Sequence, residues 1–252
     1  MKRIVLITGA TSGIGKACAQ AFAANGDQII ITGRRKDRLD ELKSDLENEY
    51  SAKVLCLDFD VQIKKEVDDS INSLPAEWKN IDILINNAGL ALGRDLFDEA
   101  DMQDWETMID TNFKGILYVS KAILPSMIKR NQGHIINIGS IAGDDMYERG
   151  NVYCASKAAV EAISKTMRID LLKHSIKVTN IKPGAADTEF GIVRFKGDAE
   201  KAAATYVGYQ PLVAADIAQS IFYCALLPAH VCINELTITC TAQANGIYSY
   251  KK

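Results

Sequence analysis

The chain has 252 residues, of which 48% are hydrophobic and 24% are charged, and this balance excludes disordered and fibrous proteins. A net charge of −3 offers no electrostatic basis for binding nucleic acid or an anionic membrane. No apolar stretch has the length of a membrane span, and the first residues enter a strand rather than a signal peptide, so we expect a cytoplasmic protein. The six cysteines stand in apolar or helical contexts without a Cys-x-x-Cys pair, which predicts buried free thiols and no metal site.

Apolar strands alternate with amphipathic helices along the chain. The predicted strands are 2–7, 28–32, 53–57, 81–86, 134–138, 177–181 and 235–239, and the predicted helices are 16–25, 36–50, 63–74, 102–130, 152–174 and 216–227. Strands composed almost entirely of Ile, Val and Leu are typical of a parallel sheet covered by helices on both faces. No linker or repeat divides the chain. The sequence therefore predicts one α/β domain, residues 1–252, with a Rossmann-type doubly wound parallel sheet of about seven strands.

One segment near the end breaks this alternation. Residues 183–210 contain several glycines and no clear strand pattern, and the segment is too long for an ordinary connection. Ligands of doubly wound sheets bind beyond the carboxyl ends of the strands. We therefore expect a substrate lid at about 184–210.

A glycine-rich loop joins the first predicted strand to the first predicted helix. It reads Thr8-Gly9-Ala10-Thr11-Ser12-Gly13-Ile14-Gly15. Gly9 permits a tight turn, Gly13 lets backbone approach a phosphate, and Gly15 lets the helix pack closely on the strand. The helix N-terminus adds free N–H groups and a positive dipole end. The loop predicts a cradle for a dinucleotide pyrophosphate, the alternative being an ordinary turn.

Two arginines follow the second predicted strand. Arg34 and Arg35 lie nineteen and twenty residues after Gly15, where a dinucleotide-binding fold contacts the adenosine ribose. An acidic residue there would bind a free 2′-hydroxyl, whereas arginine accommodates a 2′-phosphate. Together with Lys36 they crowd a helix N-terminus, whose dipole disfavours cations, so an anion should compensate them. The sequence favours NADP over NAD, the alternative being a solvated basic helix start.

Asp60 and Val61 follow the third predicted strand. Their position at the carboxyl end of that strand predicts a contact with the adenine edge. The alternative for Asp60 is a helix N-cap.

Tyr153 and Lys157 are four residues apart on a predicted helix and therefore share one face. A nearby ammonium group is expected to bring the tyrosine pKa down toward neutral pH, where a phenol can act as acid and base. Tyr248 and Lys252 have the same spacing in the tail, so spacing alone does not identify the catalytic pair, and the neighbouring residues must decide.

Two polar residues, Ser140 and Asn112, favour Tyr153 and Lys157 as the catalytic pair. Ser140 ends the strand before the Tyr153 helix and could hydrogen-bond a substrate oxygen, the alternative being a serine that caps a turn. Asn112 is a poor helix former inside a long predicted helix, which indicates a kink or a polar site that holds a water.

Together these residues resemble the short-chain dehydrogenases/reductases over essentially the whole chain. The matching motifs are the 8–15 loop, Asn86-Asn87-Ala88-Gly89, Asn112, Ser140, Tyr153-Cys154-Ala155-Ser156-Lys157 and Pro183-Gly184. The resemblance implies a catalytic tetrad of Asn112, Ser140, Tyr153 and Lys157, with Asn112 holding a water of the proton relay. It also implies a homotetramer.

The same resemblance implies the residues that contact the cofactor. Asn87 would lie near a ribose, Lys157 would bind the nicotinamide ribose, and Thr188 would reach the carboxamide or the phosphates. The predicted NADP-binding residues are Gly9, Thr11, Ser12, Gly13, Ile14, Gly15, Arg34, Arg35, Asp60, Val61, Asn87, Ala88, Gly89, Tyr153, Lys157, Pro183, Gly184 and Thr188.

A narrower resemblance is to the NADP-dependent 3-hydroxy acid dehydrogenases, which act on serine, L-allo-threonine and related acids. It rests on residues 86–93, 104–112 and 133–140, and on Thr188-Glu189-Phe190 with residues 193–198. The chain departs from that pattern at Ala185-Ala186-Asp187, which is about one residue shorter and carries an extra carboxylate. A small acid needs a cation when it leaves water, so Arg194 is the expected substrate partner beside Ser140 and Tyr153, the alternative being a surface arginine on a mobile loop.

These observations predict an NADP-dependent oxidoreductase that oxidises the hydroxyl of short 3-hydroxy acids or reduces the matching semialdehyde. One competing hypothesis is a broad-specificity NADPH carbonyl reductase. Another is a non-catalytic NADP-binding sensor or scaffold, which would have no need of the tetrad.

Overall fold

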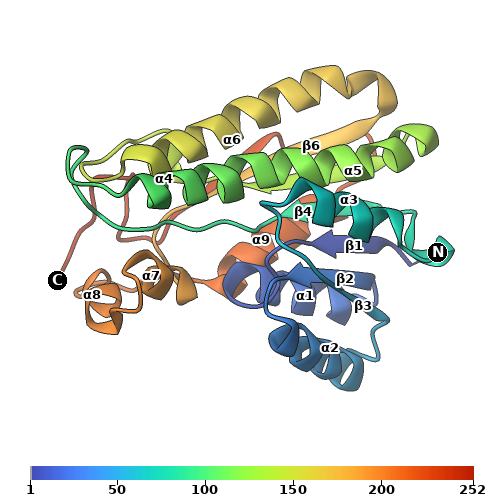
Figure 1. Ribbon diagram of the computed structural model, residues 1–252, viewed down its shortest axis with the longest axis horizontal. Coiled ribbons are helices and arrows are strands. Elements are labelled where there is room, and N and C mark those ends of the chain that lie inside the picture. The colour runs from blue at the N-terminus through green and yellow to red at the C-terminus, as the bar shows by residue number, and fades with distance from the viewer. Residues whose placement is uncertain (1) are drawn as a thin grey trace.

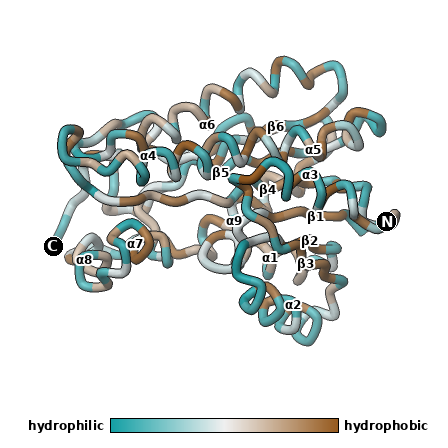
Figure 2. Tube along the Cα trace, in the orientation of Figure 1, coloured by the Kyte–Doolittle hydropathy of each residue, from teal (hydrophilic) through white to brown (hydrophobic). Residues whose placement is uncertain are grey.

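Seven parallel strands form one sheet in the order β3-β2-β1-β4-β5-β6-β9 in the computed structural model, which describes residues 2–252 (Figure 1). The strands are β1 (Ile4–Ile7), β2 (Gln28–Gly33), β3 (Val54–Asp58), β4 (Ile83–Asn86), β5 (Gly133–Ile138), β6 (Ile176–Pro183) and β9 (Glu235–Ile238). This confirms the predicted doubly wound parallel sheet. The hydrophobic colour follows the central strands in Figure 2, because both faces of these strands are covered.

Helices pack on both faces of the sheet (Figure 1). The helices are α1 (Gly13–Ala24), α2 (Lys36–Tyr50), α3 (Lys64–Asn72), α4 (Met102–Ile109), α5 (Gly115–Arg130), α6 (Asn151–Asp170), α7 (Glu189–Arg194), α8 (Ala199–Ala204) and α9 (Ala214–Leu226). Helices α1, α2 and α9 share one apolar core with the sheet, built around Phe22, Leu42 and Ile221. Helices α3 and α5 cover the other face around Leu84, Val119 and Trp78.

The predicted helix 102–130 is interrupted. A π-helical turn, Asp110–Lys114, separates α4 from α5 and contains the buried Asn112. The interruption coincides with a contact to a distant segment, because the Asn112 side chain bonds to Leu90 in the loop after β4. This is the kink that the asparagine indicated, and such turns are common at functional sites.

The 184–210 segment is more regular than predicted. It contains α7 and α8, and a short strand β7 (Ala186–Asp187) that pairs in parallel with β8 (Leu212–Val213) in a separate two-stranded sheet. Side chains at the helix starts cap them: Thr188 accepts from the Phe190 amide, and Asp198 accepts from the Lys201 amide. The expectation of a segment without a strand is therefore wrong.

The order of the strands reverses between β1 and β4. β1 runs on to β2 and β3 on one side, whereas β4 runs on to β5, β6 and β9 on the other. The loops after β1 and β4 therefore diverge at the same edge, which is where such sheets bind ligands.

Among residues 2–252, no helix is long and apolar enough to cross a membrane. All six cysteines are free; Cys56 and Cys232 are half-buried and the other four are buried. Within the same residues no group of three or more His, Cys, Asp or Glu side chains could hold a metal ion.

Candidate active site

The glycine-rich loop after β1 leaves no room for side chains at two of its glycines. Gly9 has a φ of +65°, and a Cβ there would lie 2.9 Å from the Cα of Ala88. A Cβ on Gly15 would lie 2.5 Å from both Gly9 O and Asn87 Nδ2. The loop after β1 thus packs directly on the loop after β4, and only glycine permits this approach.

Asn87 joins these two loops. Its Nδ2 donates to Thr8 O at 2.9 Å and to Gly9 O at 3.1 Å. The hydroxyl of Thr8 in turn accepts from the amides of Asn87 and Ala88, each at 3.0 Å. Thr188 reaches the same place from the 184–210 segment, because a Cβ on Gly13 would lie 3.4 Å from Thr188 Cβ. The structure therefore brings Asn87, Ala88 and Thr188 together at the glycine loop.

Arg35 lies over the glycine-rich loop. Its Nε and Nη2 donate to Thr11 Oγ1 at 3.2 and 2.6 Å, and Nη2 also donates to Ser12 Oγ at 3.1 Å. Arg34 is more exposed and pairs with Asp60 at 3.5 Å. The expected anionic compensation at this helix start is supplied in part by the protein, through Asp60 and Glu189.

Asp60 is not a helix cap, so that alternative is wrong. The residue at the N-cap of α3 is Ile63, whereas the Asp60 carboxylate accepts from the Gln62 amide at 3.0 Å. Val61 is buried, and a Cβ on Gly115 would lie 2.9 Å from its Cγ2. Both residues stay at the carboxyl end of β3, as predicted.

Asn112 holds the chain that follows β4. It is 1% exposed, accepts from Leu90 N at 2.8 Å, and donates to Leu90 O at 2.8 Å and Ser156 Oγ at 3.0 Å. A Cβ placed on Gly89 would meet Asn112 Oδ1 at 3.3 Å and Lys157 Nζ at 3.5 Å. Gly89, Asn112 and Lys157 thus converge on one point.

Ser140 begins the 3₁₀ turn Ile141–Gly143 after β5. Its hydroxyl accepts from the Ala142 amide at 3.1 Å and donates to Pro183 O at 3.4 Å. Pro183 ends β6, and Gly184 N donates to Ile238 O at 2.8 Å, so this corner is tied to β9. Ser140 thus caps a turn, as the alternative held, while its hydrogen bond to a substrate oxygen stays a prediction.

Tyr153 and Lys157 both lie on the buried face of α6. Burial raises the pKa of Tyr153, and Tyr147 adds to this effect, whereas Ser140 and Arg194 oppose it. Lys157 Nζ donates to Ile138 O at 2.8 Å and lies 6.0 Å from the centre of the Tyr153 ring. The expected lowering of the Tyr153 pKa by Lys157 is therefore wrong for this arrangement. Burial instead lowers the pKa of Lys157 to about 8.

Arg194, at the end of α7, points to Tyr153. Its guanidinium carbon lies 5.3 Å from the centre of the Tyr153 ring and 5.5 Å from that of Tyr147. Nη1 donates to Tyr147 Oη at 2.9 Å, while Nε is buried and has no hydrogen-bond partner among the described residues. The alternative of an arginine free on a mobile loop is therefore wrong. The tail pair has a different environment, because Tyr248 is 72% exposed whereas Tyr153 is buried.

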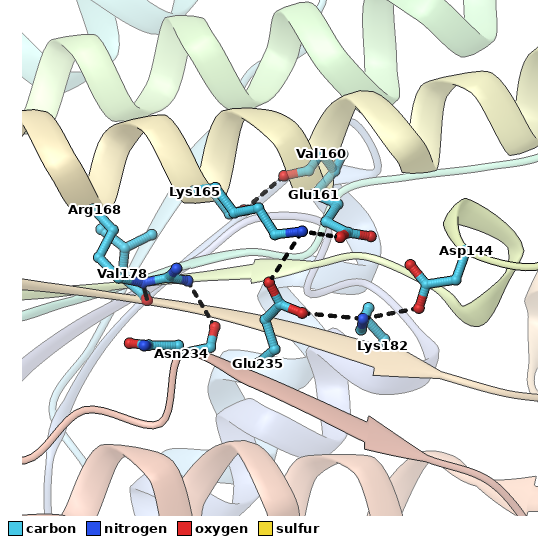
Figure 3. A network of polar contacts seen from close by, with 10 residues as sticks. Asp144, Val160, Glu161, Lys165, Arg168, Val178, Lys182, Asn234 and Glu235 are labelled. Carbon is cyan, nitrogen blue, oxygen red and sulfur yellow. Dashed lines mark hydrogen bonds and ion pairs between the residues drawn. The ribbon is translucent and has the colours of Figure 1, made fainter.

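An ion-pair network supports the Ser140 turn from outside (Figure 3). Lys182 on β6 is almost buried and contacts Asp144, which follows the turn, at 2.8 Å and Glu235 on β9 at 3.2 Å. Partial burial acts to raise the pKa values of both carboxyls, but Lys182 helps to hold them below their usual range. Lys165 on α6 reaches the same Glu235 at 3.6 Å. The network thus ties the turn to two strands and α6.

Three side chains at the site were not singled out from the sequence as site residues: Tyr147, Arg38 and Glu189. Tyr147 lies in an irregular stretch, and its contact with Arg194 spans 47 positions of the chain. Arg38 and Glu189 are 151 positions apart and meet only in the fold. His134 is a buried structural residue, and its Nε2 lies 2.8 Å from Thr179 Oγ1.

Comparison with known proteins agrees with this geometry. The family model for short chain dehydrogenases matches residues 3–198. The chain is 48% identical over 243 residues to the NADP-dependent 3-hydroxy acid dehydrogenase of Escherichia coli K12, with 96% of each chain covered. It is 45% identical over 245 residues to sulfoacetaldehyde reductase 2 of Chromohalobacter salexigens, covering 97% of this chain and 96% of that one. The closed form of serine dehydrogenase complexed with NADP⁺ superposes with a TM-score of 0.92 at 46% identity, covering 99% of both chains. The chain therefore belongs to the short-chain dehydrogenase family, as its motifs indicated.

Proposed function

We propose that this chain is an NADP-dependent oxidoreductase that oxidises the hydroxyl group of short 3-hydroxy acids, or reduces the matching semialdehyde. L-Allo-threonine, L-serine and 3-hydroxypropionate are the substrates of this class to be tested. The 48% identity to a 3-hydroxy acid dehydrogenase and the likeness to serine dehydrogenase support the class. The extra carboxylate Asp187 is exposed at the surface, so it does not by itself argue against an acidic substrate.

The residues beyond the carboxyl ends of the strands suit NADP. Gly9 and Gly15 let the glycine-rich loop pack on the loop after β4, and α1 begins at the end of this loop, where a helix N-terminus favours an anion. Arg34 and Arg35 stand where a 2′-phosphate requires cations. We propose that Thr11, Ser12, Gly13 and Ile14 hold the pyrophosphate, Asp60 and Val61 the adenine, Asn87, Ala88, Gly89 and Lys157 the riboses, and Pro183, Gly184 and Thr188 the nicotinamide end.

The tetrad residues have distinct roles in the proposed reaction. NADP, when bound, supplies the hydride acceptor or donor. Burial raises the pKa of Tyr153, so Tyr153 is a neutral phenol that gives its proton to the carbonyl oxygen during reduction, and the reverse transfer accompanies oxidation. Ser140 orients the substrate oxygen. Lys157, whose pKa of about 8 lies near neutral pH, passes the proton on, and Asn112 holds the relay water.

The observation that carries the substrate class is the placement of Arg194. The Arg194 guanidinium lies beside Tyr153, and its buried Nε has no hydrogen-bond partner within residues 2–252, so it offers a charged donor where a substrate carboxylate would lie. Tyr147 holds the other side of that guanidinium at 2.9 Å. A carboxylate leaving water requires such a partner, whereas a neutral ketone does not.

Replacing Arg194 tests this proposal against the carbonyl reductase hypothesis. In Arg194→Ala we expect kcat/KM for the three hydroxy acids to fall about 100-fold, the effect of losing one buried charge-assisted contact. Turnover of a neutral ketone should change less than about threefold. Lys201→Ala, an exposed change on α8, is the matched control. An equal loss on acids and ketones would contradict the carboxylate role, and turnover of sulfoacetaldehyde alone would move the substrate class to sulfonates.

We further propose that the 184–210 segment is the substrate lid and that the protein is a cytoplasmic homotetramer. Ile169, in the last turn of α6, and Leu172, just after that helix, are 73% and 75% exposed, which supports burial of this surface between subunits. Sedimentation velocity should give one species of tetramer mass. A monomer at micromolar concentration would contradict the tetramer.

A further inference from the structure

Glu189, the first residue of α7, lies between Arg38 of α2 and Arg35, which is the N-cap residue of α2. Arg38 Nη1 is 2.8 Å from both carboxylate oxygens, and Arg35 Nη1 is 3.2 Å from Oε2. Partial burial acts to raise the pKa of Glu189, but Arg38 and Arg35 together hold it below the usual range. The carboxylate is therefore charged at neutral pH.

The Glu189 contact leaves the arginine cluster able to bind a further anion. Arg35 forms an ion pair with Glu189 on one edge of its guanidinium and hydrogen bonds with Thr11 and Ser12 on the other. Its side chain is nevertheless 42% exposed. Three guanidinium groups, those of Arg34, Arg35 and Arg38, face two carboxylates, those of Asp60 and Glu189. The excess positive charge of this partly exposed cluster suits a dianionic phosphate.

Helix α7 connects this cluster to the substrate side of the site. Glu189 begins the helix and Arg194 ends it. Arg194 contacts Tyr147, and its carbonyl accepts from Gly93 N at 2.9 Å. Lys196 then pairs with Asp104 at 2.7 Å. A single short helix therefore joins the arginines near the glycine loop to the arginine beside Tyr153.

We propose that Glu189 is a positioning residue that couples recognition of the 2′-phosphate of NADP to placement of Arg194 at the substrate. This rests on the proposed 2′-phosphate site at Arg34 and Arg35. Glu189 orients Arg35 and Arg38 toward the phosphate, and the ordered arginines in return hold α7, so NADP strengthens closure of the 184–210 segment more than NAD does. The coupling is reciprocal, because each site must affect the other by the same factor.

Binding measurements on Glu189→Gln test the first half of the proposal. Dissociation constants for NADPH and NADH are measured by nicotinamide fluorescence, with Glu200→Gln, exposed on α8, as control. We expect the NADPH constant to rise roughly fivefold, the size of one exposed ion pair, and the NADH constant to stay within about twofold. Tighter binding of NADPH would show that Glu189 competes with the phosphate, and an equal loss for both coenzymes would show a merely structural role; either result overturns the proposal.

Limited trypsin digestion tests the second half. The exposed Lys196 and Lys201 report on the segment. In the unaltered protein, saturating NADP should protect these sites more than saturating NAD, and Glu189→Gln should abolish the difference. Persistence of the difference in Glu189→Gln would overturn the coupling.

Arg35→Ala separates this inference from the proposed function. If Arg35→Ala retains the preference for NADPH over NADH, the proposed 2′-phosphate site is wrong. If Arg35→Ala loses the preference and Glu189→Gln leaves it intact, the site stands and only the coupling fails.

Discussion

Replacing Asn112 by alanine should destabilise the protein substantially. The side chain is 1% exposed and satisfies both Leu90 N and Leu90 O, each at 2.8 Å. Alanine leaves both groups of the buried Leu90 without these partners, at about 1–3 kcal/mol each. The Ser156 hydroxyl loses a donor but keeps its bond to Tyr153 O at 2.8 Å, so its loss is small. We therefore expect Asn112→Ala to lower the free energy of unfolding by about 3 kcal/mol, including the small cavity.

Urea unfolding followed by tryptophan fluorescence measures this loss. Variant and unaltered protein must be compared at one protomer concentration, because association would shift the midpoint. Asn72→Ala, at the exposed end of α3, is the matched control and should change stability by less than about 0.5 kcal/mol. A loss below about 1 kcal/mol in Asn112→Ala would refute the reasoning, because it would mean that Leu90 finds other partners at little cost.

Three further changes test the site and its support. Burial lowers the Lys157 pKa to about 8, so the folded state binds fewer protons than the unfolded state between that value and the ordinary pKa of Lys. As pH rises from about 7 to 10, the free energy of unfolding of the unaltered protein should therefore increase by roughly 2 to 3 kcal/mol relative to that of Lys157→Met. Urea unfolding measures both. Lys182→Met should cost about 1 kcal/mol at neutral pH, allowing for solvent screening. Because the pKa values of Asp144 and Glu235 are held low, this loss should be present above about pH 4 and fade at lower pH, measured by the same unfolding. Gly9→Ala places a Cβ 2.9 Å from a neighbouring Cα at a φ of +65°, so it should cost about 1–2 kcal/mol and weaken NADPH binding in a thermal shift assay.

Two of these changes have a control variant, and the pH dependence of the third isolates its cause. Lys129→Met, at an exposed position of α5, should show no comparable pH dependence, and a Lys157→Met difference that is flat with pH would contradict the buried lysine. A Lys182→Met loss that is equally large in acid would exclude its ion pairs as the cause. Gly197→Ala shares a positive φ of +96° but has no neighbour within 4 Å, so it should keep its NADPH affinity. Equal effects of the two glycine changes would contradict the packing argument.

The regular part of the fold was predictable because local patterns determine it. The apolar strands and the amphipathic helix at Lys36–Tyr50 appear where the periodicity placed them. The polar groups at the ends of β4, β5 and β6 could be predicted to converge because parallel strands end at one edge.

Other features depend on contacts between distant segments. The π-helical turn at Asp110–Lys114 exists because Asn112 bonds to Leu90, and a helical pattern in 102–130 contains no sign of that partner. Helices α7 and α8 are each six residues long, too short for periodicity to reveal, and are held by their caps and by packing on each other. The raised pKa of Tyr153 could not be predicted from the sequence either, because the spacing of residues alone does not show how deeply a side chain is buried.

The most direct test of the proposed function follows nicotinamide absorbance with purified protein. NADP or NAD is offered with L-allo-threonine, L-serine or 3-hydroxypropionate, beside Tyr153→Phe as control. We expect turnover that prefers NADP and that Tyr153→Phe abolishes. Tight NADPH binding without turnover of any of the three acids would contradict the proposed reaction.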